Sequence, residues 1–241
     1  MTKSDTTTTT VAKQLIHNDA RFFRLFSWVI LAFVIIAFGG KAVFDTKDLP
    51  PITLMHHFHA VSILGWFVLF ALQATLIDRG NIRVHRTLGR LSPLLVITFV
   101  IFAGIISRLN WGRVGDPLIV TANMINTLLF MGFYTTAILK HRDTDTHRRF
   151  MVFATLSIIG PAAGRIPEIF DGNVFFAVPI SLAFIFTPLV YDHLFKNKIH
   201  RATIIGTALL ILTIPVLLVL SGSAEWIALL ELALGKGGSG G

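Results

Sequence analysis

Residues 53–77 read TLMHHFHAVSILGWFVLFALQATLI and contain no Asp, Glu, Lys or Arg. A helix of about 20 mostly apolar residues is long enough to cross the hydrocarbon core of a bilayer. This stretch exceeds that length without a charged side chain. We therefore predict that it forms a transmembrane helix.

The rest of the chain repeats this pattern. Of its 241 residues, 54% are hydrophobic and 14% are charged, whereas roughly 25% are charged in soluble domains. The apolar stretches are joined by short polar connectors, which excludes a water-soluble globule and leaves no room for a second soluble domain. The sequence predicts an all-α bundle of seven transmembrane helices, over Phe22–Gly40, Thr53–Ile77, Thr87–Ser107, Pro117–Leu139, Phe150–Phe170, Val174–Phe195 and Ala202–Leu220.

The two ends of the chain differ from this membrane domain, residues 22–220. Residues 1–21 are rich in Thr and predict a polar, mobile leader. The first span ends without a small-x-small cleavage site, which predicts a retained anchor. Residues 221–234 place Trp226, Leu229 and Leu230 at helical spacing, as in an interfacial amphipathic helix. Residues 235–241 (GKGGSGG) resemble a linker scar and carry no functional prediction.

The placement of Lys and Arg predicts the orientation, because cytoplasmic loops carry an excess of both. With the N-terminus inside, the inner segments hold fifteen of the 21 basic residues, namely Lys3, Lys13, Arg21, Arg24, Arg79, Arg83, Arg86, Arg90, Lys140, Arg142, Arg148, Arg149, Lys196, Lys198 and Arg201. The outer six are Lys41, Lys47, Arg108, Arg113, Arg165 and Lys236. We predict a bacterial inner-membrane protein with its C-terminus outside. The net charge of +8 then reflects orientation in the lipid bilayer and not nucleic-acid binding.

Several chemistries are excluded by composition. The chain has no Cys, which excludes disulfides, thiolate metal sites, iron–sulfur clusters and Cys nucleophiles. It also has no Ser-His-Asp arrangement, phosphate-cradling loop or dinucleotide fingerprint. The sequence therefore assigns no catalytic residue.

Two inner connectors end alike. One ends in His85-Arg86 and the other in His147-Arg148, each just before a helix enters the membrane. This repetition predicts two hairpins related by an axis along the membrane normal. The alternative is that any inner loop is rich in arginine.

These motifs also carry a resemblance, which covers roughly residues 55–170. The stretch with His57-Phe58-His59, Trp66 and Gln73, followed by His85-Arg86-Thr87-Leu88-Gly89-Arg90, resembles a widespread family of bacterial multi-pass inner-membrane proteins of unknown function. His147-Arg148-Arg149-Phe150-Met151 is similar to the second block of a related family of unknown function, which has Trp in place of Phe150. The resemblance implies a multi-pass inner-membrane protein and no established activity.

Polar residues within spans are costly, so each is a candidate functional residue. At 100° per residue, one 120° arc of the second span holds His56, His59, Ser62, Trp66 and Gln73. His57 lies on the opposite side. Polar side chains of the fourth and fifth spans lie at overlapping depth, within about 3–14 Å of the outer surface. We predict an outer ligand pocket formed by His56, His59, Trp66, Gln73, Asn123, Asn126, Arg165 and Glu168.

The composition of this layer leaves alternatives open. His56, His59 and Glu168 match a two-His, one-carboxylate site for a divalent metal, which could activate water for hydrolysis. Arg165 disfavours a bound cation and suits a small anionic or lipid-like ligand. The titratable groups would also suit a proton-coupled transporter. The structural alternative is an Arg165–Glu168 pair with Asn side chains that hold helices together, in a homodimer or as a subunit of a membrane complex.

A second candidate site lies at the inner surface. His85 and His147 occupy equivalent places on the two hairpins and could ligate haem b in an electron-transfer protein, with nearby arginines binding the propionates. The alternative is that these His-Arg pairs anchor the chain to lipid phosphate. Pro161, beside Gly160, predicts a kink in the fifth span that would widen the outer half of the bundle.

Overall fold

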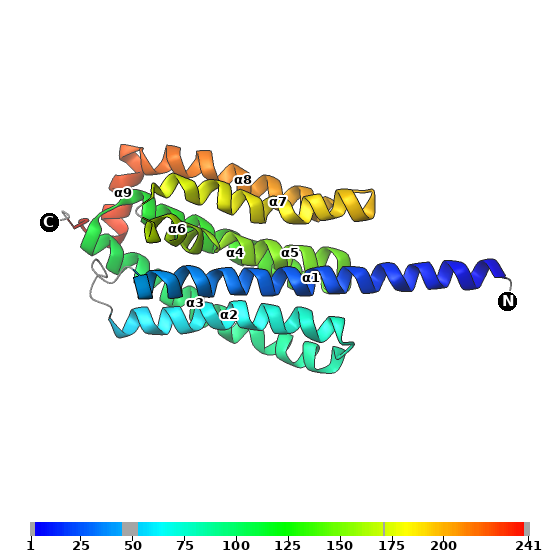
Figure 1. Ribbon diagram of the computed structural model, residues 1–241. Helices are drawn as coiled ribbons and strands as arrows, with labels where there is room; N and C mark the ends of the chain where they lie inside the picture. Colours follow the sequence, from blue (N-terminus) through cyan, green and yellow to red (C-terminus); the bar gives the residue numbers. More distant parts are fainter. Residues whose placement is uncertain (1–2, 45–52, 171, 239–241) are drawn as a thin grey trace.

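The computed structural model describes residues 3–44, 53–170 and 172–238, and this part of the chain is helical without strands (Figure 1). The prediction of an all-α protein is confirmed. The elements in chain order are α1 (Lys3–Phe44), α2 (Leu54–Asp78), α3 (Ile82–Val114), α4 (Pro117–Leu139), α5 (Thr144–Ser157), α6 (Gly160–Ile169), a 3₁₀ turn η1 (Val174–Phe176), α7 (Ala177–Lys196), α8 (Arg201–Ser221) and α9 (Ala224–Leu234).

Six of these helices are long and apolar enough to cross a membrane, and the pair α5 and α6 together meets the same test. The axes of α5 and α6 differ by 43°. The break falls between Ser157 and Gly160, beside Pro161, where the sequence predicts a kink. The bundle therefore contains six candidate spans, or seven when the broken pair counts as one.

Helix ends follow local sequence signals at the connection between α3 and α4. Gly115 ends α3 in the left-handed region with φ 65°, a conformation that glycine adopts without steric cost. Asp116 then caps α4 by accepting a hydrogen bond from the Leu118 N–H at 2.8 Å, and Pro117 occupies the first turn. Helix α3 runs from Ile82 to Val114 and therefore extends beyond both ends of the predicted third span, Thr87–Ser107.

The helices run back and forth along one direction (Figure 1). The turns after α2, α4 and α7 lie at the end of the bundle from which α1 projects, called here the N-terminal end. The C-terminus and α9 lie at the other, C-terminal end. All the Lys and Arg residues of those three turns are therefore gathered at one end of the molecule.

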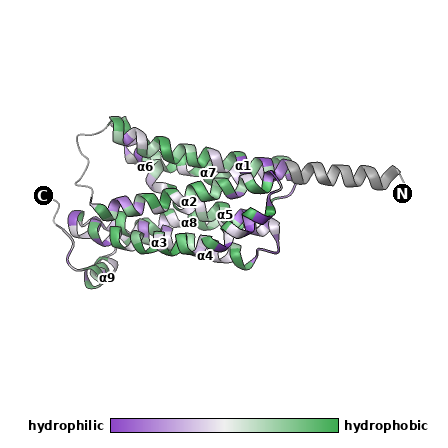
Figure 2. Cartoon of the chain, turned by 90° about the horizontal axis from the view of Figure 1, so that it is seen from below, coloured by the Kyte–Doolittle hydropathy of each residue, from purple (hydrophilic) through white to green (hydrophobic). Residues whose placement is uncertain are grey.

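Hydrophobic residues predominate along the helices (Figure 2), and many of them are exposed on the outside of the bundle. Large side chains such as Val61, Leu128 and Val219 are at least 65% exposed. In water such continuous apolar surface would drive aggregation, whereas a bilayer covers it. The protein is a multi-pass helical membrane protein.

The predicted boundary between leader and membrane domain does not coincide with a boundary in the fold. Helix α1 begins at Lys3 and continues without interruption through residues 21 and 22. Asp19, placed by the sequence in the leader, is only 3% exposed. The packed part of α1 therefore starts before the predicted first span.

The C-terminal segment folds back onto the bundle. The predicted helix near residues 221–234 is present as α9, and Leu230 is buried against Trp111 of α3 and Val120 of α4. Trp226 donates a hydrogen bond from Nε1 to Thr121 Oγ1 at 2.8 Å. Beyond α9, the Gly235 carbonyl accepts a hydrogen bond from the Trp111 indole at 2.7 Å. Helix α9 thus covers the end of α3 and the start of α4.

Candidate functional site

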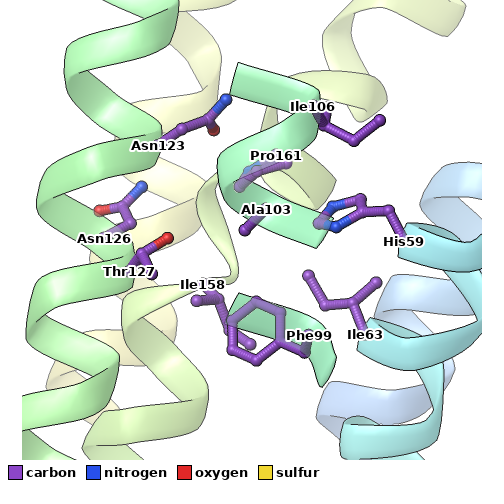
Figure 3. Close-up of a pocket in the computed structure, with 10 residues that line it drawn as sticks. All are labelled: His59, Ile63, Phe99, Ala103, Ile106, Asn123, Asn126, Thr127, Ile158 and Pro161. Carbon is purple, nitrogen blue, oxygen red and sulfur yellow. The ribbon is translucent and has the colours of Figure 1, made fainter. Parts of the chain in front are cut away.

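A small cavity lies in the C-terminal half of the bundle, between α2, α3, α4 and the break that separates α5 from α6 (Figure 3). It encloses about 50 Å³. The ten lining residues are His59, Ile63, Phe99, Ala103, Ile106, Asn123, Asn126, Thr127, Ile158 and Pro161. None of them carries a formal charge when His59 is neutral.

The polar groups of the cavity come from two helices that face each other (Figure 3). His59 projects from α2, whereas Asn123, Asn126 and Thr127 lie on consecutive turns of α4. His59, Asn123 and Asn126, which the sequence predicts to lie in one layer, all line this cavity. Together they offer hydrogen-bond donors and acceptors at neutral charge.

The His59 ring gives the strongest sign of a binding group. Its Nδ1 atom is buried and has no hydrogen-bond partner in the part of the chain that the structure describes. Leaving a buried polar atom unbonded costs about 1–3 kcal/mol, and most such atoms in proteins are bonded. His59 therefore combines a ring that lines the cavity with a buried nitrogen that has no partner among the described residues.

The other two histidines of α2 do not line the cavity, which was predicted for His57 but not for His56. His57 is exposed, whereas Ser62 and Trp66 are buried, so the bundle-facing side of α2 is correctly predicted. His56 does not line the cavity. It caps α2 locally, since its Nδ1 lies 2.8 Å from Thr53 Oγ1 at the first turn of the helix.

Trp66 and Gln73 lie deeper along α2 and also outside the cavity lining. Trp66 is 2% exposed, donates to Thr155 Oγ1 at 3.2 Å and packs edge-on against Phe130. This indole joins α2 to α5 and packs in the core on the N-terminal side of the cavity. Gln73 lies nearer the N-terminal end of the bundle, against Gly89 of α3. Trp66 and Gln73 are about two and four helical turns from His59, and each turn adds about 5.4 Å along the helix axis, so both lie away from the cavity.

Arg165 and Glu168 belong to a different surface from the cavity. They form an ion pair of 2.9 Å on α6, and Glu168 also pairs with Lys41 of α1 at 3.2 Å. The Arg165 guanidinium lies 5.7 Å from the centre of the Phe38 ring on α1. The i,i+3 spacing puts both side chains on one face of α6, and their contacts with Lys41 and Phe38 show that this face meets α1. Neither residue lines the cavity, in contrast to the prediction from the sequence.

The predicted metal ligands are not brought together. His56 bonds to Thr53, and Glu168 is occupied by two cationic side chains. Among the residues that the structure describes, no three His, Asp or Glu side chains converge on a point where a metal ion could be held. The donor set His56, His59 and Glu168 therefore does not fit a metal ion.

His85 and His147, the predicted haem ligands, lie at the N-terminal end of the bundle at the starts of α3 and α5. His147 Nδ1 lies 2.7 Å from the Ala137 carbonyl oxygen, while the buried Nδ1 of His85 has no partner among the described residues. Of the arginines available for haem propionates, Arg148 and Arg149 are held by acidic side chains. The arginines next to His147 are thus occupied by other interactions.

A buried ionic cluster, not predicted from the sequence, lies at the N-terminal end of the bundle. Arg149 of α5 pairs with Asp192 of α7 at 2.5 Å, and their side chains are 3% and 1% exposed. Thr203 of α8 donates to Asp192 at 2.6 Å and accepts from Arg149 at 3.1 Å. The cluster therefore joins three helices through fully buried charges.

A second acidic residue extends this cluster to α1. Asp19 pairs with Arg148 at 2.6 Å and with Lys196 at 2.5 Å, and it accepts a hydrogen bond from Tyr191 at 2.6 Å. The sequence does contain a signal for this cluster, since Asp192 is an acidic residue inside the predicted span Val174–Phe195. Such a residue requires a partner on another helix, whereas the sequence suggests only a local pair of Asp192 with His193 and no role for Asp19.

The connection between α7 and α8 adds a titratable cap beside this cluster. His200 accepts a hydrogen bond from the Ala202 N–H through Nδ1 at 3.1 Å and so caps α8. Burial, followed by the Arg149 charge, lowers the pKa of His200, against a smaller opposing effect of nearby Asp residues. The folded protein therefore favours the neutral ring.

Comparisons with protein-family models, with curated proteins and with solved structures find no match to this chain. The geometry of the cavity and of the buried cluster thus carries the functional argument alone.

The buried pair predicts an asymmetric response to mutation. Arg149→Leu should lower the free energy of unfolding by about 3–5 kcal/mol, because it leaves the Asp192 carboxylate buried without its partner. The double variant Arg149→Leu/Asp192→Leu should recover most of this loss. Thermal unfolding in detergent measures both. A single variant as stable as the wild type would show that the pair does not hold α5 to α7.

The cap predicts a pH dependence of stability. His200 binds its proton less readily when folded, so its contribution to the free energy of unfolding is constant above pH 6.5, the ordinary pKa, and falls as the pH drops below it. His200→Asn keeps a good capping side chain without a titrating group. The loss in melting temperature between pH 7.5 and 5.5 should therefore be smaller in His200→Asn. Equal losses in both proteins would contradict this role.

Proposed function

We propose that this protein binds a small, uncharged, hydrogen-bonding molecule in the cavity between α2, α3 and α4. The observation that carries the proposal is the buried, unpartnered Nδ1 of His59, whose ring lines the same, mostly apolar cavity as two carboxamides. Binding sites for small molecules are commonly apolar with a few polar groups that fix orientation. This cavity has that composition.

The charge of the proposed ligand follows from what lines the cavity. A charged ligand in a membrane interior requires an opposite charge beside it. The sequence predicts an anionic ligand because Arg165 could provide the opposite charge. In the structure, however, its guanidinium is paired with Glu168 at 2.9 Å. A neutral carbonyl, amide or hydroxyl compound needs no counter-charge and can use the donors and acceptors of His59, Asn123 and Asn126.

The size of the ligand is limited by the cavity. About 50 Å³ exceeds the roughly 10–15 Å³ that one water molecule needs. It corresponds to a few non-hydrogen atoms, so the occupant is a very small molecule or the polar end of a longer one. The apolar side chains Ile63, Phe99 and Ile158 favour a ligand with a hydrocarbon portion.

The proposal includes seven spans with the N-terminus in the cytoplasm of a bacterial cell. The opposite placement of the two termini in Figure 1 supports an odd number of crossings, with α5 and α6 as one broken span. The basic turns at the N-terminal end support its placement inside. The cavity then lies in the outer half of the bilayer.

A pair of neighbouring histidines tests the ligand proposal. His59→Leu removes the cavity group, whereas His57→Leu removes an exposed imidazole two residues away. The probes are uncharged short-chain amides, ketones and alcohols. A probe at 100 times its dissociation constant should add about 2.7 kcal/mol to the free energy of unfolding of the wild type and of His57→Leu. The same probe should leave His59→Leu unchanged.

A second cavity variant separates binding from folding. Asn126→Leu alters the opposite wall without touching α2 and should also lose the response to the probe. Equal stabilisation of His57→Leu and His59→Leu would contradict the proposal. So would a panel in which charged analogues stabilise the wild type and neutral ones do not.

Single cysteines test the orientation, since the native chain has none. Thr144 and Asn173 are exposed in connections that adjoin opposite ends of the bundle. In intact cells, Thr144→Cys should be protected from a membrane-impermeant thiol reagent and Asn173→Cys should be labelled. Permeabilised cells serve as the control, in which both sites should react. The reverse pattern in intact cells would place the cavity in the inner half of the bilayer.

A further inference from the structure

Three arginines form a stripe at the start of α3. Taking 100° per residue from Arg83, Arg86 lies at about −60° and Arg90 at about −20°, so all three share one side of the helix. Each is exposed. None has an ion-pair or hydrogen-bond partner for its guanidinium in the part of the chain that the structure describes. This separates them from Arg148 and Arg149, which are held by acidic side chains.

The same side of α3 continues as an exposed apolar track. Leu94, Ile97 and Ile101 lie at about +20°, −40° and 0° on the same scale, and they are 66%, 56% and 55% exposed. The opposite side of the helix is buried, as Phe99 and Ala103 show with 1% and 9% exposure. The stripe and the track therefore form one continuous outward face.

The length of this face matches a phospholipid. From Arg90 to Ile101 the helix rises about 16 Å, close to half of the roughly 30 Å hydrocarbon core. A phosphate held at the arginines would place its acyl chains along Leu94, Ile97 and Ile101. Guanidinium groups bind phosphate oxygens through paired, charge-assisted hydrogen bonds.

We propose that this face of α3 binds an anionic phospholipid, with its headgroup on Arg83, Arg86 and Arg90 and its acyl chains on the apolar track. A lipid fits this face because the arginines and the apolar track follow each other along one side of α3, over about the thickness of one leaflet. The tendency of inner loops to be basic accounts for the number of arginines. It does not account for their alignment with an exposed apolar track on one side of one helix.

The anionic headgroup follows from the charge on the stripe. Each basic side chain near the membrane surface is worth about fivefold in affinity for an anionic lipid. Three together give a preference on the order of 100-fold over a zwitterionic lipid with the same acyl chains. At the other end of the same face, Arg108 is alone, so the corresponding preference there is about fivefold.

The test uses the purified full chain with equal amounts of phosphatidylglycerol and phosphatidylcholine of identical acyl chains, and counts bound lipids by native mass spectrometry. The stripe variant is Arg83→Gln/Arg86→Gln/Arg90→Gln. The matched control is Lys140→Gln/Arg142→Gln/Arg201→Gln, which removes three exposed basic side chains at the same end of the bundle from other elements. Wild type and control should retain phosphatidylglycerol preferentially, and the stripe variant should lose that preference.

Three results would overturn the proposal. One is equal retention of the two lipids by the wild type, and another is an equal loss of preference in the stripe and control variants. The third is displacement of the bound lipid by millimolar glycerol 3-phosphate, which would make the stripe a site for a soluble anion. If the triple variant does not fold, Arg86→Gln alone should reduce the preference about fivefold.

Discussion

The burial of Arg149 against Asp192 constrains the rest of the bundle more than any other interaction. With both side chains at most 3% exposed, neither charge can be satisfied by water. An unpaired buried charge costs several kcal/mol, so α5, α7 and α8 have to meet where Arg149, Asp192 and Thr203 are in contact. Asp19 adds α1 to the same arrangement through Arg148 and Lys196. The N-terminal end of the bundle is thus fixed by charge pairing and not only by apolar packing.

This fixed end contrasts with the C-terminal half, where α5 breaks at Ser157 and α6 departs by 43°. The cavity lies beside that break, with Ile158 and Pro161 in its wall. The acidic oxygens of the buried cluster accept hydrogen bonds from side chains of neighbouring helices, whereas His59 Nδ1 in the cavity has no partner among the described residues. The paired carboxylates hold helices together, while the unpaired atom beside the cavity supports the proposed binding site. The two polar layers therefore have different roles, although both consist of costly intramembrane polar residues.

Much of the fold could be predicted from the sequence, because span length and the break at Pro161 depend on local properties. The helical face of α2 was also predictable, since His59 and Trp66 lie on one arc and His57 does not. The site was predictable only in part. Depth along a helix indicates which residues share a layer, but it does not say toward which neighbour a side chain points. Arg165 and Glu168 lie at the predicted depth and pair on the side of α6 that faces α1, and this direction depends on the packing of α6 after the break.

The arginines of this chain show why residue type and depth are insufficient. Arg149 is buried with an acid from another helix, and Arg165 is half-exposed with an acid on its own helix. Arg86 is exposed without a partner in the described structure. The rest of each helical face distinguishes the three. Buried residues surround Arg149 on α5, and a Glu follows Arg165 at i+3. Exposed apolar side chains continue the face of Arg86 on α3. The function of a charged residue near a membrane is therefore read from the side of the helix it occupies, and that side is defined only once the neighbouring helices are in place.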